Sequence, residues 1–182
     1  MKYLLLLFVS INIYSQTEFK FDKDGFTDFI VGECEGKSQS ELYKKAIEWI
    51  SINYKNPKEV IKATIENDYI RIEGSEKCLV ALNVLGKNCF TSKYQLEFSF
   101  KDGKYKLDFI DVTSYIPASQ NSVGRWYTEN FENINVYFKD SGELRSRYKY
   151  YMEIPIYFNK INTDLKNYLN SNNANPSKKN DW

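Results

Sequence analysis

Apolar and polar residues alternate most regularly on either side of Asp102-Gly103. Every second residue is apolar over residues 94–101 and again over 104–109. Asp-Gly is a strong signal for a two-residue turn, and a period of two is that of a strand with one buried face. The pattern therefore predicts a hairpin. Its apolar face carries these facing pairs: Leu96 with Phe109, Phe98 with Leu107 and Phe100 with Tyr105.

A second hairpin is predicted to turn at Asn67-Asp68. A third and weaker one, around Asp140-Ser141-Gly142, would join residues 134–138 to 144–151. Centring the second hairpin on its turn gives these facing pairs: Ile65 with Ile70, Ala63 with Ile72, Lys62 with Glu73 and Thr64 with Arg71. The two stronger hairpins each have one apolar and one polar face. Four such strands predict an antiparallel sheet that is covered on one side.

Two segments have the three- and four-residue spacing of amphipathic helices. Ser38 and Glu41 form a capping box before the first, which should end near Tyr54, ahead of Asn56-Pro57. Its buried stripe is predicted to contain Leu42, Ala46, Trp49 and Ile50, and its solvent face Lys44, Lys45 and Glu48. The second helix is predicted over residues 156–170, with Pro155 suited to a first turn. Its apolar positions are Ile154, Phe158, Ile161, Leu165 and either Tyr168 or Leu169.

The first residues have the composition of an export signal. Lys2 is followed by a short apolar run, Tyr3–Val9, and later by a small residue, Ser15. This order predicts a secretory signal peptide over residues 1–15, cleaved after Ser15; the alternative is a buried N-terminal strand or helix. The apolar run is too short to span a bilayer. We therefore expect an exported protein, periplasmic or secreted, without a transmembrane segment in its mature chain.

The remaining chain has a length that suits one domain. We expect a single α+β domain over residues 26–169, opening with a strand over Phe26–Val31. Residues 16–25 are expected to be an N-terminal linker. Residues 170–182 are rich in Asn, Lys and Ser and are expected to be a disordered tail.

Charge and composition exclude several classes of chemistry. With 25 basic and 24 acidic residues, the overall charge gives no reason to expect nucleic acid or anionic lipid as a partner. The chain has no histidine, which excludes hydrolases with a histidine-activated nucleophile and removes the commonest zinc ligand. We expect no metal and no cofactor. Cys78 and Cys89 flank a segment short enough to reverse direction and are the candidate disulfide; three reduced thiols, Cys34 included, are the alternative.

Two carboxylates are predicted to lie face to face. Glu97 and Asp108 are opposite each other across the Asp102-Gly103 hairpin, where they could share a proton or hold a cation. Lys101 and Lys106 lie on the same face and can neutralise them, which favours a structural role.

Two other patterns resemble reactive or metal-binding groups. Residues 22–25, Asp-Lys-Asp-Gly, resemble part of a calcium loop, but Lys20 and Val31 stand where ligands are needed, so a polar turn is expected. Ser146 and Lys149 have the Ser-x-x-Lys spacing of some acyl enzymes. The segment alternates like a strand, which would send the two side chains to opposite faces.

The longest segment without a clear element is Ser114–Asn133. A connection of this length is either functional or contains an unrecognised element. It contains Arg125, Trp126 and Tyr127, which combine a planar cation with two large rings, as binding surfaces often do. These three residues are the candidate binding site. The alternative is that Trp126 closes the end of the sheet or lies in a short helix.

The order of elements and two stretches, Ser40–Ile50 and Phe100–Tyr105, resemble a bacterial family. The family is a domain of unknown function with a fold like that of the TATA-binding protein (TBP-like), found mostly in exported proteins of Bacteroidetes. The resemblance covers about Phe26–Tyr115 and implies a TBP-like core over residues 26–115. After it, the residue pattern predicts a loop and hairpin insertion over 116–151 and a C-terminal helix over 154–169. It implies no catalytic residues, because none are known for the family.

These observations together predict a curved antiparallel β-sheet packed on one face by two helices. They favour a non-enzymatic ligand-binding module, whose site is the Ser114–Asn133 segment or a gap between the sheet and the C-terminal helix. Its partner would be a small ligand or an envelope protein. Two alternatives stay open: an interaction domain that docks a partner on the polar sheet face around Tyr69, and a hydrolase that works with carboxylates alone.

Overall fold

Three long neighbouring strands dominate the computed structural model, which describes residues 16–171. The strands of the main sheet are β3 (Phe29–Glu33), β4 (Ile61–Ile65), β5 (Tyr69–Asn83), β6 (Lys87–Lys101), β7 (Lys104–Ile116) and β8 (Arg125–Thr128). They are antiparallel, in the order β3-β7-β6-β5-β4, and β8 pairs with β7. The predicted signal peptide, residues 1–15, lies outside the described residues.

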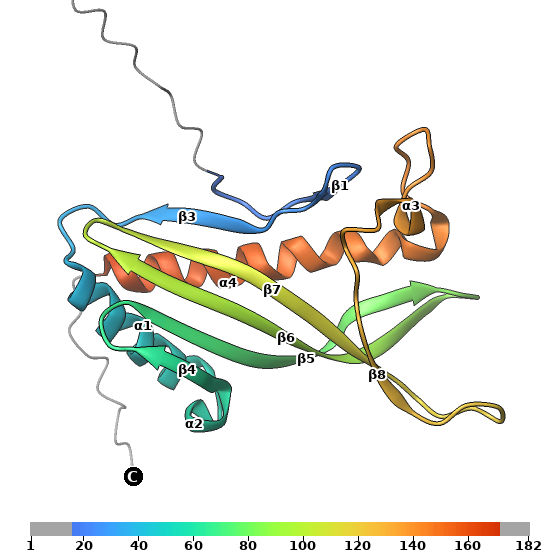
Figure 1. Ribbon diagram of the computed structural model, residues 1–182, viewed down its shortest axis with the longest axis horizontal. Helices are drawn as coiled ribbons and strands as arrows, with labels where there is room; N and C mark the ends of the chain where they lie inside the picture. Colours follow the sequence, from blue (N-terminus) through green and yellow to red (C-terminus); the bar gives the residue numbers. More distant parts are fainter. Residues whose placement is uncertain (1–15, 172–182) are drawn as a thin grey trace, which may run out of the picture.

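Two long helices pack on one face of this sheet, as the sequence predicts (Figure 1). They are α1 (Gln39–Asn53) and α4 (Glu153–Asn170). Short helical segments complete the chain: α2 (Pro57–Val60), α3 (Ile134–Tyr137) and the 3-10 helix η1 (Ser146–Met152). The α+β class and the one-sided cover are confirmed. No helix within residues 16–171 is both long enough and apolar enough to cross a membrane.

The hairpin at Asp102-Gly103 has the predicted register. Leu96 pairs with Phe109, Phe98 with Leu107 and Phe100 with Tyr105. Five of these side chains are buried, and that of Phe109 packs against the same core. One extra residue interrupts the pairing between Gln95 and Leu96. Such a bulge increases the local twist of the strand that contains it.

The register predicted for β4 and β5 is wrong by one residue. The connection has three residues, 66–68, and Asn67 has a positive φ of 63°. Asn adopts this left-handed conformation at lower cost than most residues, and a three-residue loop shifts the pairing by one position. The observed partners are Ile65 with Tyr69, Thr64 with Ile70 and Ala63 with Arg71. Ile65 is therefore exposed rather than buried.

The helix α1 begins and ends where the capping box and Asn56-Pro57 predict. The Ser38 hydroxyl accepts a hydrogen bond from the backbone N–H of Glu41, at 3.2 Å. The predicted apolar stripe is buried. The prediction that Lys45 lies on the solvent face is wrong, because its side chain is only 8% exposed. Its ammonium group donates to the carbonyl oxygens of Leu169, at 3.1 Å, and of Ser171, at the C-terminus of α4. A cation there is favoured by the helix dipole.

The segment expected to be a linker, residues 16–25, is part of the core. Phe19 and Phe21 are fully buried, and β1 (Phe21–Asp22) forms a small hairpin with β2 (Gly25–Phe26). The side-chain amide of Asn159 in α4 fixes this segment: its oxygen accepts from Phe19 N at 2.7 Å and its nitrogen donates to Phe19 O at 3.0 Å. The predicted strand over Phe26–Val31 is correspondingly split between β2 and β3.

The third predicted hairpin is wrong in its strands but retains its turn. Phe138 and Leu144 form a single bridge across the turn, while α3 precedes it and η1 follows it. Tyr148 and Tyr151 are three residues apart, so a 3-10 helix places both on one side. Their rings pack against Tyr137, with centroids 5.0 and 5.3 Å away. Residues 134–151 therefore add an aromatic cluster to the core in place of the predicted hairpin.

Two buried tyrosines lie over glycines on the neighbouring strand. Tyr94 is paired with Gly74, and Tyr105 with Gly32. A Cβ atom at either glycine would lie within 2.3 Å of the facing ring. The absence of a side chain thus lets each ring lie flat on the sheet. The helix α4 ends at Asn170, as predicted, so the tail does not include this residue; the helix begins at Glu153, three residues earlier than predicted. Residues 172–182 of that tail lie outside the described part of the chain.

Candidate functional site

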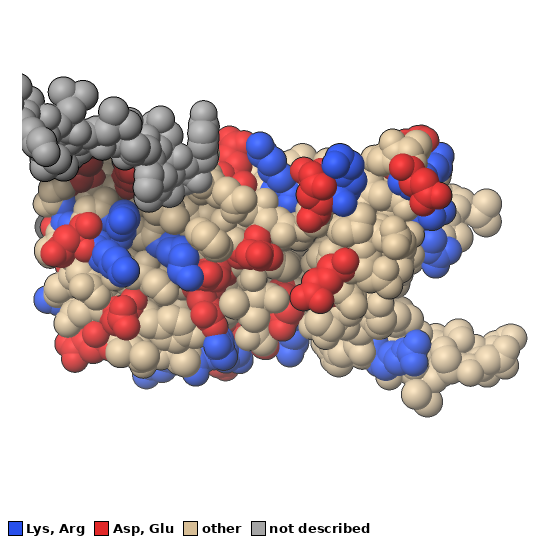
Figure 2. All heavy atoms as spheres, turned by 45° about the horizontal axis from the view of Figure 1, so that its top comes forward, with Lys and Arg blue, Asp and Glu red and all other residues tan. Residues whose placement is uncertain are grey.

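Two hairpins project from one end of the sheet, with a pocket between them. One is the β5–β6 turn at residues 84–86, and the other joins β7 to β8 over residues 117–124 (Figure 1). Figure 2 shows this end hollowed between two projections. The pocket has a volume of about 210 Å³ and an apolar wall of Val80, Leu82 and Phe90 from the sheet.

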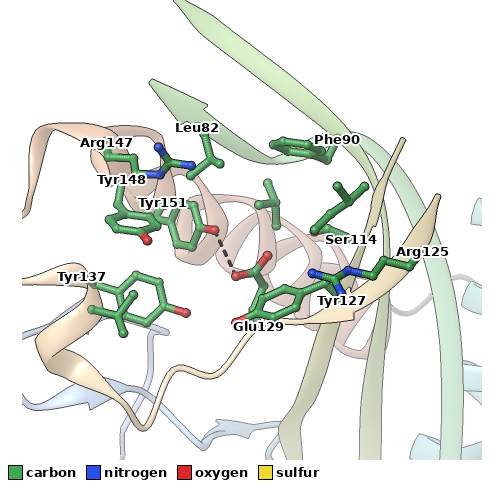
Figure 3. Close-up of a pocket in the computed structure, with 13 residues that line it drawn as sticks. Leu82, Phe90, Ser114, Arg125, Tyr127, Glu129, Tyr137, Arg147, Tyr148 and Tyr151 are labelled. Carbon is green, nitrogen blue, oxygen red and sulfur yellow. Dashed lines mark hydrogen bonds between the residues drawn. The ribbon is translucent and has the colours of Figure 1, made fainter. Parts of the chain in front are cut away.

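Four tyrosines make up much of the remaining wall (Figure 3). Tyr127 comes from β8, Tyr137 from α3, and Tyr148 and Tyr151 from η1. Tyr137 and Tyr151 are buried, whereas Tyr127 and Tyr148 keep part of their rings exposed to the pocket mouth. Aromatic faces of this kind bind flat or apolar groups, and their hydroxyls can hydrogen-bond at the same time.

Glu129 is the single acidic side chain that lines the pocket. The Tyr151 hydroxyl donates a hydrogen bond of 3.0 Å to its Oε2 atom (Figure 3). Burial raises the pKa of the Glu129 carboxyl above its ordinary value, and hydrogen bonds from Tyr151 and Ser114 offset part of that rise. The carboxyl can therefore act as a hydrogen-bonding group inside the pocket.

Arg125 and Arg147 reach the pocket from opposite sides (Figure 3). Arg125 belongs to β8 and Arg147 to η1, and both are exposed. Neither forms an ion pair with any acidic side chain in residues 16–171. A guanidinium group binds carboxylate or phosphate in a planar, two-pronged geometry. The pocket thus combines aromatic walls with two cations that have no acidic partner in the described structure.

Comparison with known proteins finds a family to which the central segment is similar. Residues 30–114 match the family model described as a domain of unknown function (DUF4468) with TBP-like fold. This part of the chain is similar to that family, and we refer to residues 30–114 below as the DUF4468 domain. The resemblance expected from Ser40–Ile50 and Phe100–Tyr105 is confirmed. No curated protein matches the chain.

Two solved structures share the fold of the DUF4468 domain. A DUF4468 family protein from Bacteroides ovatus superposes with a TM-score of 0.63 at 14% identity, covering 90% of this chain and 96% of that chain. A TBP-like protein from Parabacteroides distasonis gives a TM-score of 0.52 at 16% identity, covering 78% of this chain and 90% of that chain. The TBP-like fold and the Bacteroidetes-type character of the family are therefore supported.

The pocket lies where the DUF4468 domain meets the residues that follow it. Val80, Leu82, Phe90 and Ser114 belong to the domain, and the rest of the lining comes from residues 116–151. The site therefore forms only when both parts of the chain are folded together.

The structure divides the three candidate binding residues between two faces of β8. Arg125 and Tyr127 line the pocket, but Trp126 points to the other face because side chains alternate along a strand. Trp126 is 46% exposed, with its ring 5.4 Å from that of Tyr115 and 5.1 Å from the Lys93 ammonium. Trp126 thus lies outside the pocket, and it neither closes the sheet nor lies in a helix.

Sequence reasoning missed Glu129, Tyr137, Arg147, Tyr148 and Tyr151. The last three were assigned to a strand, and their helical spacing was the signal that could have placed them together. All five lie within residues 116–151 but on β8, α3 and η1 or beside them, so only the folding of this segment brings the set to one place.

The facing carboxylates Glu97 and Asp108 are paired as predicted, but each has its own cation. Arg71 Nε donates to Glu97 Oε1 at 2.6 Å, and Lys106 Nζ lies 2.8 Å from Asp108 Oδ1. Two separate ion pairs on an open sheet face explain the carboxylates structurally. The counter-ion of Glu97 is Arg71, which the sequence did not suggest.

The other two patterns also have structural explanations. In residues 22–25, Asp22 Oδ1 accepts from the N–H of Asp24 at 2.8 Å, as in a polar turn. Ser146 lies in a 3-10 helix rather than the predicted strand, but its hydroxyl accepts from Asn83, and the Lys149 ammonium lies over the Tyr150 ring. Within residues 16–171, no three His, Cys, Asp or Glu side chains gather to hold a metal ion.

A disulfide joins Cys78 to Cys89 across β5 and β6, and Cys34 is a buried free thiol. The bond lies below the 84–86 turn, where the pairing of the two strands is interrupted between Lys77 and Val80. It therefore holds together the base of one hairpin that borders the pocket.

Proposed function

We propose that this protein is a non-enzymatic binding module that takes up the acidic, ring-bearing end of a small ligand in the tyrosine pocket. One observation carries the proposal. Two arginines without an acidic partner in residues 16–171, Arg125 and Arg147, face a cavity whose walls combine four tyrosine rings with apolar side chains. An anionic group would satisfy the guanidinium groups, and a ring or apolar body would fill the space between the tyrosines.

The dimensions of the pocket limit what it can hold. Sites that enclose a whole drug-sized ligand measure roughly 300–1,000 Å³. The cavity here, about 210 Å³, is smaller and open at one side. It suits a single ring, or the end of a longer molecule whose remainder lies outside the pocket between the two hairpins.

The acid–base groups of the pocket support binding rather than catalysis. Hydrolysis by carboxylates alone uses two of them on either side of the scissile bond. The pocket lining has one, Glu129, and that carboxyl accepts a hydrogen bond from Tyr151. Our proposal therefore assigns Glu129 to ligand hydrogen bonding.

The proposed place of action is the periplasm or the outside of the cell. The N-terminal pattern of residues 1–15 supports export. The Cys78–Cys89 disulfide agrees with an oxidising compartment, where such bonds persist.

A docking role for the outer sheet face has less support. Its charged side chains satisfy one another, as in the pairs Arg71–Glu97 and Lys106–Asp108, and Glu73 lies near both Lys62 and Lys93. Tyr69, which would mark an exposed patch, is half-buried. These charged side chains are therefore already neutralised within the face.

The test uses a planar aromatic sulfonate, 1-anilinonaphthalene-8-sulfonate, as a fluorescent probe, alongside native mass spectrometry of protein purified from its own host. We expect the double variant Arg125→Gln and Arg147→Gln to bind the probe at least about tenfold more weakly, since each charge-assisted contact contributes about 1.5–3 kcal/mol. Arg145→Gln is the control, because Arg145 adjoins the same 3-10 helix but does not line the pocket. Equal probe affinity in the double variant and the control would overturn the proposal.

A further inference from the structure

The β5–β6 turn presents an apolar tip to solvent. Leu85 is fully exposed and Val84 is 45% exposed. Leu85 also has a positive φ of 52°, a conformation that a bulky side chain rarely adopts and that Asn, Asp or Gly would adopt more easily. The turn is nevertheless well held, because the Asn88 side chain donates to the carbonyl oxygens of Val84 and Gly86, at 2.6 and 3.1 Å. An apolar side chain is thus held outward at a conformational cost.

The second projecting hairpin has a polar tip, residues 119–122, with an exposed apolar side chain beside it. Val123, next to the tip of the β7–β8 connection, is 82% exposed. A bridge between Ser119 and Ser122 closes the turn just before it. Both hairpins project from the same end of the molecule in Figures 1 and 2. The exposed side chains of Leu85 and Val123 therefore can meet one surface together.

The chain behind these tips is basic, although the whole protein is nearly neutral. Residues 80–92, 113–128 and 144–152 form the two hairpin ends and η1, and they contain no acidic residue. Their basic residues are Lys87, Arg125, Arg145, Arg147 and Lys149. Of these, Lys87 has an ion-pair partner, Glu153 at 2.6 Å, and the other four have none within residues 16–171.

We propose that this end of the molecule docks on an anionic lipid surface. Leu85 and Val123 enter the boundary between headgroups and acyl chains, and the unpaired basic side chains behind them face the lipid phosphates. Trp126, half-exposed on β8, has the amphipathic ring that favours such an interface. Charge distinguishes a lipid partner from a protein partner. Exposed apolar side chains alone would suit a protein groove, but the four cations without an acidic partner in residues 16–171 match a negatively charged bilayer.

This docking needs no ligand in the pocket: Leu85, Val123, Arg145 and Lys149 do not line it, although Arg125 and Arg147 do. It also brings the pocket mouth to the membrane surface. Any acidic amphiphile that is released from, or delivered to, that surface would then meet Arg125 and Arg147 without crossing bulk water.

Sedimentation with lipid vesicles tests the proposal on the whole protein. Vesicles are made of phosphatidylcholine alone or of phosphatidylcholine and phosphatidylglycerol in equal parts. We expect sedimentation with the anionic vesicles only, and less of it as salt is raised. The double variant Leu85→Asp and Val123→Asp should bind these vesicles at least about tenfold more weakly, because two apolar side chains no longer enter the lipid.

Ile65→Asp is the matched control. Ile65 is an exposed apolar residue beside a hairpin turn at the opposite end of the sheet (Figure 1). The Ile65→Asp variant should bind vesicles like the unchanged protein.

The double tip variant should keep its fold, since Asp tolerates the positive φ at position 85 better than Leu does. An unchanged near-ultraviolet circular dichroism spectrum would show this.

Three outcomes would overturn the proposal: no sedimentation of the unchanged protein with anionic vesicles, equal binding by the double tip variant, or equal loss in Ile65→Asp. Its failure is separable from that of the proposed ligand site. The vesicle assay responds to the tip residues, whereas the sulfonate probe responds to Arg125 and Arg147.

Discussion

The hydroxyl of Tyr151 lies 3.0 Å from the carboxylate of Glu129 and donates a hydrogen bond to it. This contact joins η1 to the chain that leaves β8, and so connects two sides of the tyrosine pocket. It also places the only carboxyl of the pocket lining next to a buried phenol. The ionised form of Glu129 is stabilised by that hydrogen bond, but the loss of solvent around it has the larger effect.

Glu129→Gln should therefore change how stability depends on pH. Burial raises the pKa of the Glu129 carboxyl in the folded state, so the neutral form favours folding and this contribution is lost as pH rises through that pKa. Glutamine keeps the acceptor for Tyr151 without the charge. We expect the variant to melt a few degrees above the unchanged protein at pH 7, with the difference vanishing near pH 4. Thermal melts across this range measure it, with exposed Glu132→Gln as control; parallel curves would contradict it.

Lys45→Met should cost more than Lys44→Met. The buried Lys45 ammonium donates to backbone carbonyls at the C-terminus of α4, whereas Lys44 is exposed on the same helix. Removing the cation leaves those carbonyls without a donor and loses its favourable position at the helix end. We expect the unfolding free energy to fall by about 1–2 kcal/mol in Lys45→Met and by less than about 0.5 kcal/mol in Lys44→Met, measured by urea denaturation. Equal losses would refute the capping role.

Thiol counting should give one reactive group in denatured, non-reduced protein. Cys34 is free, and Cys78 is bonded to Cys89. In the native protein the count should fall to zero, because Cys34 is buried. Replacing Cys78 and Cys89 together by serine should lower stability by about 2–3 kcal/mol, as expected for a short closed loop. A count of three thiols in the denatured protein is the result that would disprove the bond.

Gly74→Ala should destabilise the sheet through Tyr94. A Cβ atom at position 74 would lie 2.2 Å from the Tyr94 ring, which is fully buried and cannot swing into solvent. Overpacking of this kind costs about 1–3 kcal/mol. The same substitution in a Tyr94→Leu background should cost clearly less, and urea denaturation of the four proteins in this cycle measures the coupling. Equal costs in both backgrounds would show that the ring is not the obstacle.

The parts of the fold predicted from sequence are those fixed by neighbours in the chain. The pairing of Leu96 with Phe109 follows from one turn, Asp102-Gly103, whose length sets the register. The Ser38 cap and the apolar stripe of α1 are likewise local. The β4–β5 register failed because Asn67 adopts a positive φ in a longer loop, a choice that two-residue turn statistics do not reveal.

The candidate site was predicted in part for the same reason. Arg125 and Tyr127 were found because they are close together in a conspicuous segment, and alternation along β8 then excluded Trp126. Arg147 and Tyr151 were missed because the segment looks like a strand, and the aromatic cluster around Tyr137 stabilises it as a 3-10 helix. No local preference identifies such a cluster in advance.

The sequence by itself determined the fold class, the hairpin around Asp102-Gly103 and the two covering helices, because periodicity reflects a few neighbouring residues. Its composition also excluded chemistry that needs a histidine, because the chain has none. Only the tertiary structure decided that Phe19 and Phe21 belong to the core, that Lys45 is buried at the end of α4, and that Glu129 meets Tyr151. It also placed Arg125, Arg145, Arg147 and Lys149 at one end without acidic partners in residues 16–171. Each of these depends on contacts between segments far apart in the chain, where packing and charge are settled only once the whole sheet has formed.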